Sequence, residues 1–193
     1  MREFLEIIRK NAARMSRLTE DLLTLARVES GEQRFDIQRV SAEELLQDAL
    51  ESFVEVARSY GVELVIENSV PAANVNANRE AIHQIFSNLI ENALKYAASG
   101  KKVILGARAA EGSVEFYVRD FGSGISSEHL PRLFERFYRV DKARSRESGG
   151  TGLGLAIAKH IVLAHEGTIR AESELNHGST FLFTLPASEP DSA

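Results

Sequence analysis

The first thirty residues carry a helical pattern of hydrophobic positions. They contain no glycine or proline and are followed by Gly31, so we expect one long helix. Seam positions recur at alternating steps of three and four residues, a spacing typical of a coiled coil or helical bundle. These positions are Ile8, Asn11, Met15, Leu18, Leu22 and Leu25. A stripe this narrow stabilises an isolated helix poorly, so we expect it to pack against a partner helix.

Beyond residue 35 the pattern changes to short β-type segments separated by amphipathic helices. Ser41 and Glu44 form a capping box, which predicts a helix that runs to Tyr60 and stops at Gly61. Further helices are expected at 79–98, 129–134 and 151–165, and strands at 62–69, 74–77, 101–109, 113–120, 167–175 and 179–186. This order predicts an α/β fold, a two-layer α/β sandwich with helices on one face of a mixed sheet. The tail 189–193 is expected to fray.

Composition and charge exclude several classes of protein. The length of 193 residues fits one domain with an appendage. The chain has no cysteine, which excludes disulfides, thiolate metal sites and a cysteine nucleophile. Its 23 Lys and Arg against 28 Asp and Glu argue against a dedicated nucleic-acid-binding protein. No apolar run approaches the ~20 residues needed to cross a bilayer, so we expect a cytoplasmic chain without a membrane segment.

The helix expected at 79–98 has two distinct faces at ~100° per residue. One face is expected to enter the core and carries Ile82, Phe86, Leu89, Ala93 and Ala97. Asn88, Asn92 and Lys95 fall together on another side, although asparagine disfavours helix interiors. A solvated polar face is the simpler interpretation of these three residues in isolation. The functional alternative is a platform for magnesium and phosphate, because amide oxygens suit a hard cation and an ammonium group suits phosphate.

Two glycine-rich segments carry further candidate chemistry. Asp120, Gly122 and Gly124 follow a strand, where glycines let a flat ligand approach the backbone and a carboxylate can accept from an exocyclic amine. Such a pattern also occurs as a simple turn. The segment 149–155 runs into a helix and so offers an anion site, but it matches neither the Walker nor the Rossmann pattern. The long irregular stretch 121–152 is typical of a functional loop or lid.

Taken in order, these motifs resemble the N, G1, F and G2 boxes of sensor histidine kinases, members of the GHKL ATP-binding superfamily. The matching segments are Asn88 to Tyr96, Asp120 to Gly124, Phe134 to Arg139 and Gly150 to Leu155. The resemblance covers nearly the whole chain and is greatest to the phosphate-sensor, PhoR-like type. It implies the GHKL (Bergerat) ATP-binding fold, with a mainly antiparallel sheet, over residues 35–188 and a lid at about 138–150.

The resemblance also implies a role for each matching residue towards Mg·ATP. Asn92 would coordinate the Mg²⁺ that bridges the ATP phosphates. Asp120 would accept from the adenine amino group, and Thr180 would help to hold adenine. The other implied ATP-binding residues are Asn88, Lys95, Tyr96, Gly122, Gly124, Ile125, Phe137, Tyr138, Arg139, Gly150, Thr151, Gly152, Leu153 and Gly154. The basic lid residues are Lys142, Arg144 and Arg146, for which a solvated loop is the simpler interpretation.

Position 88 bears on whether ATP is hydrolysed or used for transfer. Hydrolytic members of the superfamily place a glutamate one helical turn before the magnesium-binding asparagine, where it acts as a general base. Here that position is Asn88, which cannot take a proton, and Glu91 is expected to point about 100° away from Asn92. The sequence therefore favours transfer of the phosphate to another nucleophile.

The phosphoacceptor of a histidine kinase is missing. The family phosphorylates a histidine in an H-E-x-x-x-P box on the first helix of a dimerisation hairpin. All five histidines lack that context and are expected to be structural or exposed: His83, His129, His160, His165 and His177. Residues 1–34 instead resemble the second helix of the hairpin, so we expect a fragment that binds Mg·ATP without phosphorylating itself. Its implied partners are the phosphoacceptor helix of the same kinase and a response regulator receiver domain, within a homodimeric bacterial inner-membrane sensor.

Other functions of the same fold stay open. A serine or anti-sigma-factor kinase would use the same nucleotide site, although the N-terminal bundle helix counts against it. Another GHKL ATPase is a further alternative. A nucleotide-binding interaction module without activity is disfavoured because every box is intact.

Overall fold

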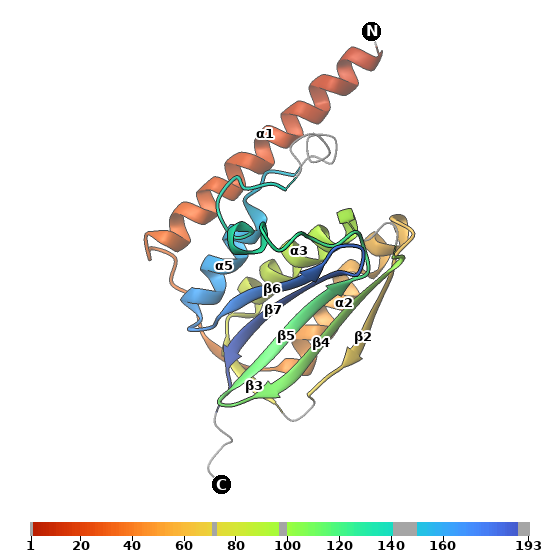
Figure 1. Cartoon of the computed structure of the whole chain (residues 1–193). Helices are drawn as coiled ribbons and strands as arrows, with labels where there is room; N and C mark the ends of the chain where they lie inside the picture. The colour runs from red at the N-terminus through yellow and green to blue at the C-terminus, as the bar shows by residue number, and fades with distance from the viewer. Residues whose placement is uncertain (1, 71–72, 97–99, 141–149, 189–193) are drawn as a thin grey trace.

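The computed structural model describes residues 2–70, 73–96, 100–140 and 150–188. Its helices are α1 (Arg2–Glu29), α2 (Ala42–Ser59), α3 (Arg79–Tyr96) and α5 (Gly154–Ala164), with a 3₁₀ helix at Leu130–Arg132. Its strands are β1 (Gln38–Ser41), β2 (Glu63–Asn68), β3 (Asn74–Ala77), β4 (Lys102–Ala110), β5 (Ser113–Asp120), β6 (Ile169–Glu174) and β7 (Gly178–Pro186) (Figure 1).

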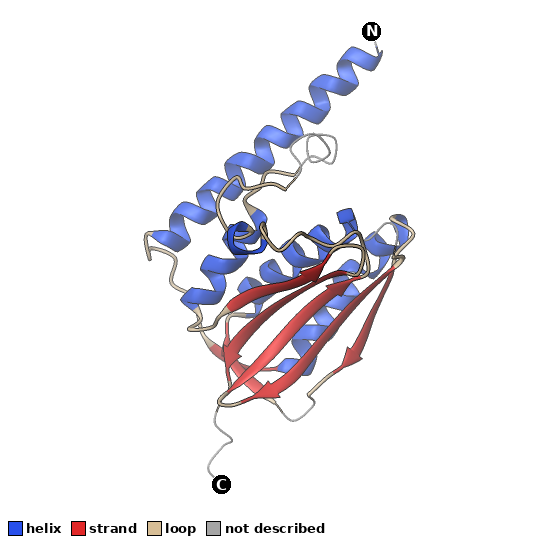
Figure 2. Ribbon diagram, in the orientation of Figure 1, coloured by secondary structure: helices blue, strands red, loops and turns tan. Residues whose placement is uncertain are grey.

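A five-stranded sheet with helices on one face forms the body of the molecule. The strand order is β2-β4-β5-β7-β6, in which β2 and β4 are parallel and the other neighbours are antiparallel. Helices α2, α3 and α5 lie on one side of this sheet (Figure 2). The predicted two-layer α/β sandwich with a mixed, mainly antiparallel sheet is therefore confirmed.

The core lies between α3 and the sheet. Phe86 from α3, Phe116 from β5 and Phe183 from β7 are fully buried, with ring centroids 5.1–6.0 Å apart. The strands contribute every second residue to this layer, as the alternation of side chains along a strand requires. The described part of the core face expected on α3 is buried as predicted, and Ala81, Ile85, Ile90 and Leu94 extend it.

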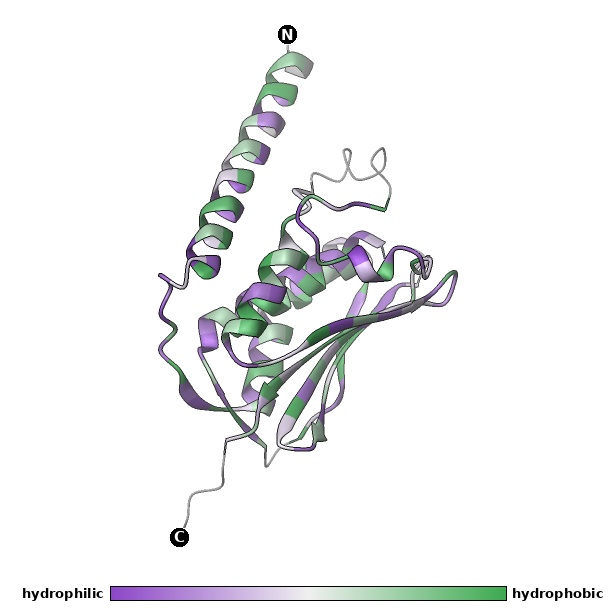
Figure 3. Ribbon diagram, turned by 60° about the vertical axis from the view of Figure 1, so that its left-hand side comes forward, coloured by the Kyte–Doolittle hydropathy of each residue, from purple (hydrophilic) through white to green (hydrophobic). Residues whose placement is uncertain are grey.

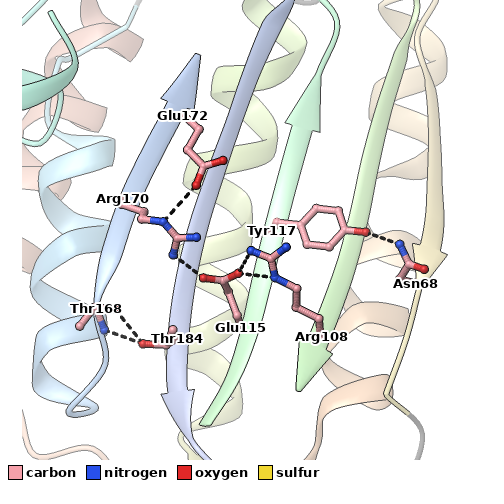
Figure 4. Close-up of polar contacts among 8 residues, drawn as sticks. All are labelled: Asn68, Arg108, Glu115, Tyr117, Thr168, Arg170, Glu172 and Thr184. Atoms are coloured by element: carbon pink, nitrogen blue, oxygen red, sulfur yellow. Dashed lines mark hydrogen bonds and ion pairs between the residues drawn. The ribbon is translucent and has the colours of Figure 1, made fainter. Parts of the chain in front are cut away.

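The opposite face of the sheet carries polar side chains (Figure 4). Glu115 on β5 lies between the guanidinium groups of Arg108 on β4 and Arg170 on β6, and both donate to its carboxylate. The Tyr117 hydroxyl accepts from Asn68 Nδ2 at 2.7 Å. These paired groups keep the outer face compatible with water, so this face of the sheet needs no covering helix.

Several element bounds differ from those expected. Strand β1 was not expected, because its four residues bury only Val40 and show no readable alternation; it pairs with β3 in a separate two-stranded sheet. The helix expected at 151–165 begins at Gly154, because Gly152 has a positive φ of 78° that ends any helical run before it. The expected helix at 129–134 is only a 3₁₀ helix. Outside the described residues lie 97–98, most of the lid with Lys142, Arg144 and Arg146, and the tail.

Helix α1 is a single helix, as predicted, but it is anchored only near its C-terminus. Leu25 and Val28 are buried where α1 packs on α5, and Leu18 is half-buried. The N-terminal half extends away from the rest of the molecule (Figures 1 and 3). Exposed hydrophobic side chains along α1 are Phe4, Leu5, Ile7, Ile8, Met15, Leu22 and Leu23. Among the described residues, no helix combines the length and apolar character needed to span a bilayer.

Candidate functional site

A cavity of about 370 Å³ lies between α3, the segment after β5, the segment before α5, and α1. A volume of this order is typical of a small-molecule site. The sequence-predicted residues that line it are Asn88, Asn92, Lys95, Tyr96, Asp120, Gly124, Ile125, Tyr138, Arg139, Gly150, Thr151, Gly152 and Gly154. In the folded protein, residues from all four motifs therefore line the same cavity.

The α3 wall of the cavity presents amide and ammonium groups. Asn88, Asn92 and Lys95 all line it, because steps of four and three residues bring them onto one helix face. The Nδ2 atom of Asn88 is buried, and no described group accepts its hydrogen bonds. Burial lowers the pKa of Lys95, and the nearby charge of Glu91 opposes that effect. A half-buried ammonium group and an unsatisfied amide favour a polar, anionic ligand at this wall.

A buried carboxylate marks another wall. Asp120 is the last residue of β5, is only 3% exposed, and its Oδ1 accepts from the Gly122 backbone N–H at 2.8 Å. Burial raises the pKa of this carboxyl, although hydrogen bonds from the Gly122 and Ser179 backbones oppose the shift. The apolar side chains of Leu133 and Phe181 also line the cavity. A carboxylate acceptor beside apolar walls fits a flat heterocycle with an exocyclic amine.

The glycines after Asp120 are required by close backbone packing. A Cβ atom at Gly122 would overlap the carbonyl oxygen of Tyr96, and one at Gly124 would overlap that of Glu174. Gly124 also has a positive φ of 66°, which side chains other than glycine disfavour. The loop therefore lies tightly against α3 and β6, which fixes the position of the Asp120 wall.

The N-terminal end of α5 forms a further wall. Gly150, Thr151, Gly152 and Gly154 line the cavity there. The Leu153 backbone N–H donates to Thr151 Oγ1 at 3.3 Å, and no side-chain hydrogen bond caps the helix at Leu153. Free backbone N–H groups and the helix dipole make such a terminus favourable for phosphate.

The F-box residues Tyr138 and Arg139 close one side of the cavity. Tyr138 is held from outside, because its hydroxyl is 2.7 Å from His129 Nδ1 and the Arg132 guanidinium lies 4.4 Å from its ring centroid. The positive charge of Arg139 acts on Lys95, so the two cations share one region. Repulsion between them would be relieved by a bound polyanion.

Four sequence-predicted residues do not line the cavity. Gly122 serves backbone packing, Leu153 is fully buried in the core, and Phe137 is more than half exposed with a φ of 60°. Thr180 pairs with Arg119 on the outer side of the sheet, whereas its neighbour Ser179 lines the cavity. The alternation of β7 carries the signal for Ser179, because it shares a face with the buried Phe181.

Sequence reasoning also missed the contribution of α1. Arg17 and Asp21 line the cavity, and the Thr151 hydroxyl donates to Asp21 Oδ2 at 2.6 Å. Glu91, expected to point away, lines the cavity as well and lies 3.8 Å from Lys95 Nζ. Nothing in the α1 pattern signals these contacts, because they depend on how the helix packs across α5. The remaining unpredicted lining residues are Gln84, Ser87, Ser123, Leu133, Val140, Leu155 and Phe181.

The described residues contain no group of three His, Asp or Glu side chains able to hold a metal ion by themselves. A magnesium ion at this site would therefore depend on oxygen atoms of a nucleotide together with an amide such as that of Asn92. This donor set fits a hard cation that retains waters and phosphate ligands.

Comparison with known proteins identifies the family. A model described as histidine kinase-, DNA gyrase B-, and HSP90-like ATPase matches residues 77–189. Sensor histidine kinase RppB of Synechocystis is 36% identical over 94% of the chain, and the phosphate regulon sensor protein PhoR of Pseudomonas aeruginosa is 35% identical over 92%. The chain spans 40% of the length of each.

Solved structures agree with these relatives. Full-length ShkA in complex with AMPPNP matches 98% of the chain at a TM-score of 0.83 with 29% identity, and the chain covers 39% of it. The catalytic domain of histidine kinase ThkA matches 79% of the chain at a TM-score of 0.68 with 26% identity, and the chain covers 96% of that domain. The chain therefore belongs to the histidine kinase-, DNA gyrase B- and HSP90-like ATPase family, as an ATP-binding catalytic domain of the sensor histidine kinase type.

Proposed function

We propose that this chain binds Mg·ATP in the cavity and serves as the catalytic part of a longer sensor histidine kinase. In the intact protein the γ-phosphate would pass to a histidine on a separate helix, and then to an aspartate of a response regulator. One observation carries the proposal: a single cavity combines the buried Asp120 carboxylate with a cationic wall and an open helix terminus.

The cavity has a carboxylate with apolar walls on one side and cationic groups on another, which suits the adenine ring and the phosphates of ATP respectively. Asp120 would accept from the adenine amino group, and Leu133 and Phe181 would contact the ring. Lys95, Arg139 and the α5 terminus would bind the phosphates. Mg²⁺ bound with the nucleotide would neutralise phosphate charge, and Asn92 would offer it an amide oxygen.

The absence of a carboxylate at position 88 supports transfer over hydrolysis. Asn88 cannot activate water as a general base. Glu91 does border the cavity, which keeps ATP hydrolysis as a second candidate function, but its carboxylate lies beside Lys95 and accepts from Ser87 Oγ at 3.4 Å. Phosphate release from ATP separates the two: a rate that falls when Glu91 is replaced by Gln would favour hydrolysis.

We further infer that α1 is the second helix of a dimerisation hairpin whose first helix carries the phosphoacceptor. Two facts support this assignment: full-length ShkA matches α1 together with the domain, and the α1 seam leaves Ile8, Met15 and Leu22 exposed. The phosphoacceptor helix and a response regulator receiver domain would be its partners, in a homodimer. The intact protein would be a membrane-anchored bacterial sensor with this part in the cytoplasm.

Calorimetry with Mg·ATP tests the binding site. Asn92→Ala removes a cavity amide, and Asn76→Ala removes an exposed amide on β3 as a matched control. We expect ATP binding to be lost in the first variant and retained in the second. Equal affinities in both would refute the assignment of Asn92.

Labelled ATP tests the transfer step. Incubated with γ-labelled ATP, the chain alone should acquire no acid-labile label, since none of its histidines lies in a phosphoacceptor box. A separate helix that carries such a box should become labelled in trans. Acid-labile label on the chain itself would contradict the proposal.

A further inference from the structure

Two charged side chains of α1 face the nucleotide cavity. Arg17 and Asp21 are four residues apart, so they lie on one face of the helix, and both line the cavity. Their charges act on Lys95 in opposite senses, with Arg17 lowering and Asp21 raising its pKa. They therefore belong to the same electrostatic environment as the cationic wall.

Asp21 accepts the hydrogen bond of the Thr151 hydroxyl, a donor that a bound phosphate would otherwise use. The Thr151 hydroxyl donates to Asp21 Oδ2 at 2.6 Å and accepts from the Leu153 backbone N–H at the start of α5. A carboxylate thus lies next to the helix terminus that suits an anion. Burial raises the pKa of Asp21, the hydrogen bond from Thr151 and the charge of Arg17 oppose that shift, and repulsion from the charge of Glu91 adds to it. A second anion, such as a triphosphate, would add to this repulsion.

The contact is set by a firmly docked helix. Leu25 and Val28 are buried against the domain one to two turns beyond Asp21. At the end of α1, Glu29 pairs with Arg136 Nη2 at 2.5 Å and with His160 Nε2 at 2.9 Å. Asp21 is therefore held at the cavity by packing and polar contacts that do not involve the nucleotide.

We propose that Asp21 and Arg17 of α1 are affinity-determining residues of the ATP site, with opposite effects. Asp21 competes with the polyphosphate for Thr151 and weakens ATP binding, whereas Arg17 attracts the polyphosphate and strengthens it. This inference rests on the proposed ATP function. Because both residues belong to α1, the position of this helix and the binding of ATP in the cavity are energetically coupled.

Charge-neutral variants of the full chain test the proposal. Asp21→Asn keeps an oxygen that can accept from Thr151 and removes the charge, and Arg17→Gln removes the opposite charge. Glu20→Gln and Arg9→Gln are matched controls, because both parent side chains are exposed on α1 and neither lines the cavity. Calorimetry with Mg·ATP should show Asp21→Asn binding about tenfold tighter and Arg17→Gln about tenfold weaker than the parent, with the controls within about twofold.

Adenosine distinguishes a phosphate effect from a change in the fold. It lacks phosphates, so its affinity should be the same in all five proteins. An equal change for adenosine and ATP, or an Asp21→Asn variant that binds ATP no more tightly than Glu20→Gln, overturns the proposal. If the parent chain binds no ATP at all, the proposed function fails together with this inference. If the parent binds ATP normally and the α1 variants do not differ, only this inference fails.

Reciprocal coupling gives a second readout. If Asp21 opposes the polyphosphate, ATP should slow amide hydrogen exchange in residues 17–25 more in Asp21→Asn than in the parent. The same degree of protection in both proteins would contradict the coupling.

Discussion

Replacement of Asp120 by Asn should weaken ATP binding and stabilise the free protein. Asp120 is 3% exposed and is the carboxylate that we assign to the adenine amino group. Asparagine has nearly the same shape, and its Oδ1 can still accept from the Gly122 N–H. However, the other carboxylate oxygen of Asp120 is replaced by an NH₂ group, which cannot accept a hydrogen bond from the adenine amine.

The expected loss of affinity follows from one charged hydrogen bond. A hydrogen bond to a charged group contributes about 1.5–3 kcal/mol, so the dissociation constant for Mg·ATP should rise by about 10- to 150-fold. Calorimetry on the parent and Asp120→Asn measures this change. Glu111→Gln is the control, because it removes the same charge from the exposed turn between β4 and β5. An Asp120→Asn variant with parental affinity would refute the adenine assignment.

The effect on stability has the opposite sign. Burial raises the folded pKa of Asp120 above its unfolded value, so ionisation of the buried carboxyl costs stability above that pKa. This cost disappears as the pH falls below the unfolded pKa, where both states are protonated. The free energy of unfolding of Asp120→Asn should therefore exceed that of the parent by more at pH 7 than near pH 4. Denaturant titrations at both pH values that gave a constant difference would contradict this reasoning.

Three further predictions follow from packing and protonation. Gly124→Ala should cost about 2–3 kcal/mol more than Gly112→Ala in denaturant unfolding, because both glycines have φ near +65° but only Gly124 meets a backbone carbonyl; equal costs would refute the packing argument. His165 is buried with a lowered pKa, so its contribution to stability should be lost as pH falls below about 6.5, and His165→Gln should flatten that slope in thermal unfolding. Leu25→Ala should destabilise the chain by up to about 2–5 kcal/mol and speed amide exchange in α1, whereas the exposed Leu23→Ala should change neither.

The sequence was sufficient for most of the secondary structure, because the patterns were long and well punctuated. The α2 helix begins after Ser41, whose Oγ accepts from the Glu44 N–H at 3.4 Å, and the chain turns after it at Gly61 with a φ of 69°. Strands β4 and β5 lie within one residue of the ranges expected at 101–109 and 113–120, and Gly112, with a φ of 64°, lies in the turn between them. Strand β1 was missed because only Val40 of its four residues is buried, so the segment shows no alternation of hydrophobic and polar positions.

The residues that line the cavity could be predicted where local spacing places side chains on one surface. The face of α3 with Asn88, Asn92 and Lys95 follows from helix geometry alone, and these residues line the cavity together. Thr180 was a less accurate choice than Ser179, although strand alternation distinguishes them. Motif matching pointed to a segment that borders the cavity but did not determine which of its two adjacent side chains faces the helices.

The sequence by itself determined most of the elements, the four motifs and the family, since each depends on residues close together in the chain. Only the tertiary structure decided that α1 packs on α5, that Arg17 and Asp21 reach the cavity, and that Asp21 accepts from Thr151 across 130 positions of the chain. The physical reason is that the seam of α1 specifies an apolar stripe without specifying what covers it. Burial of Leu25 and Val28 fixes the rotation of the helix, and that rotation places the two charges at the cavity.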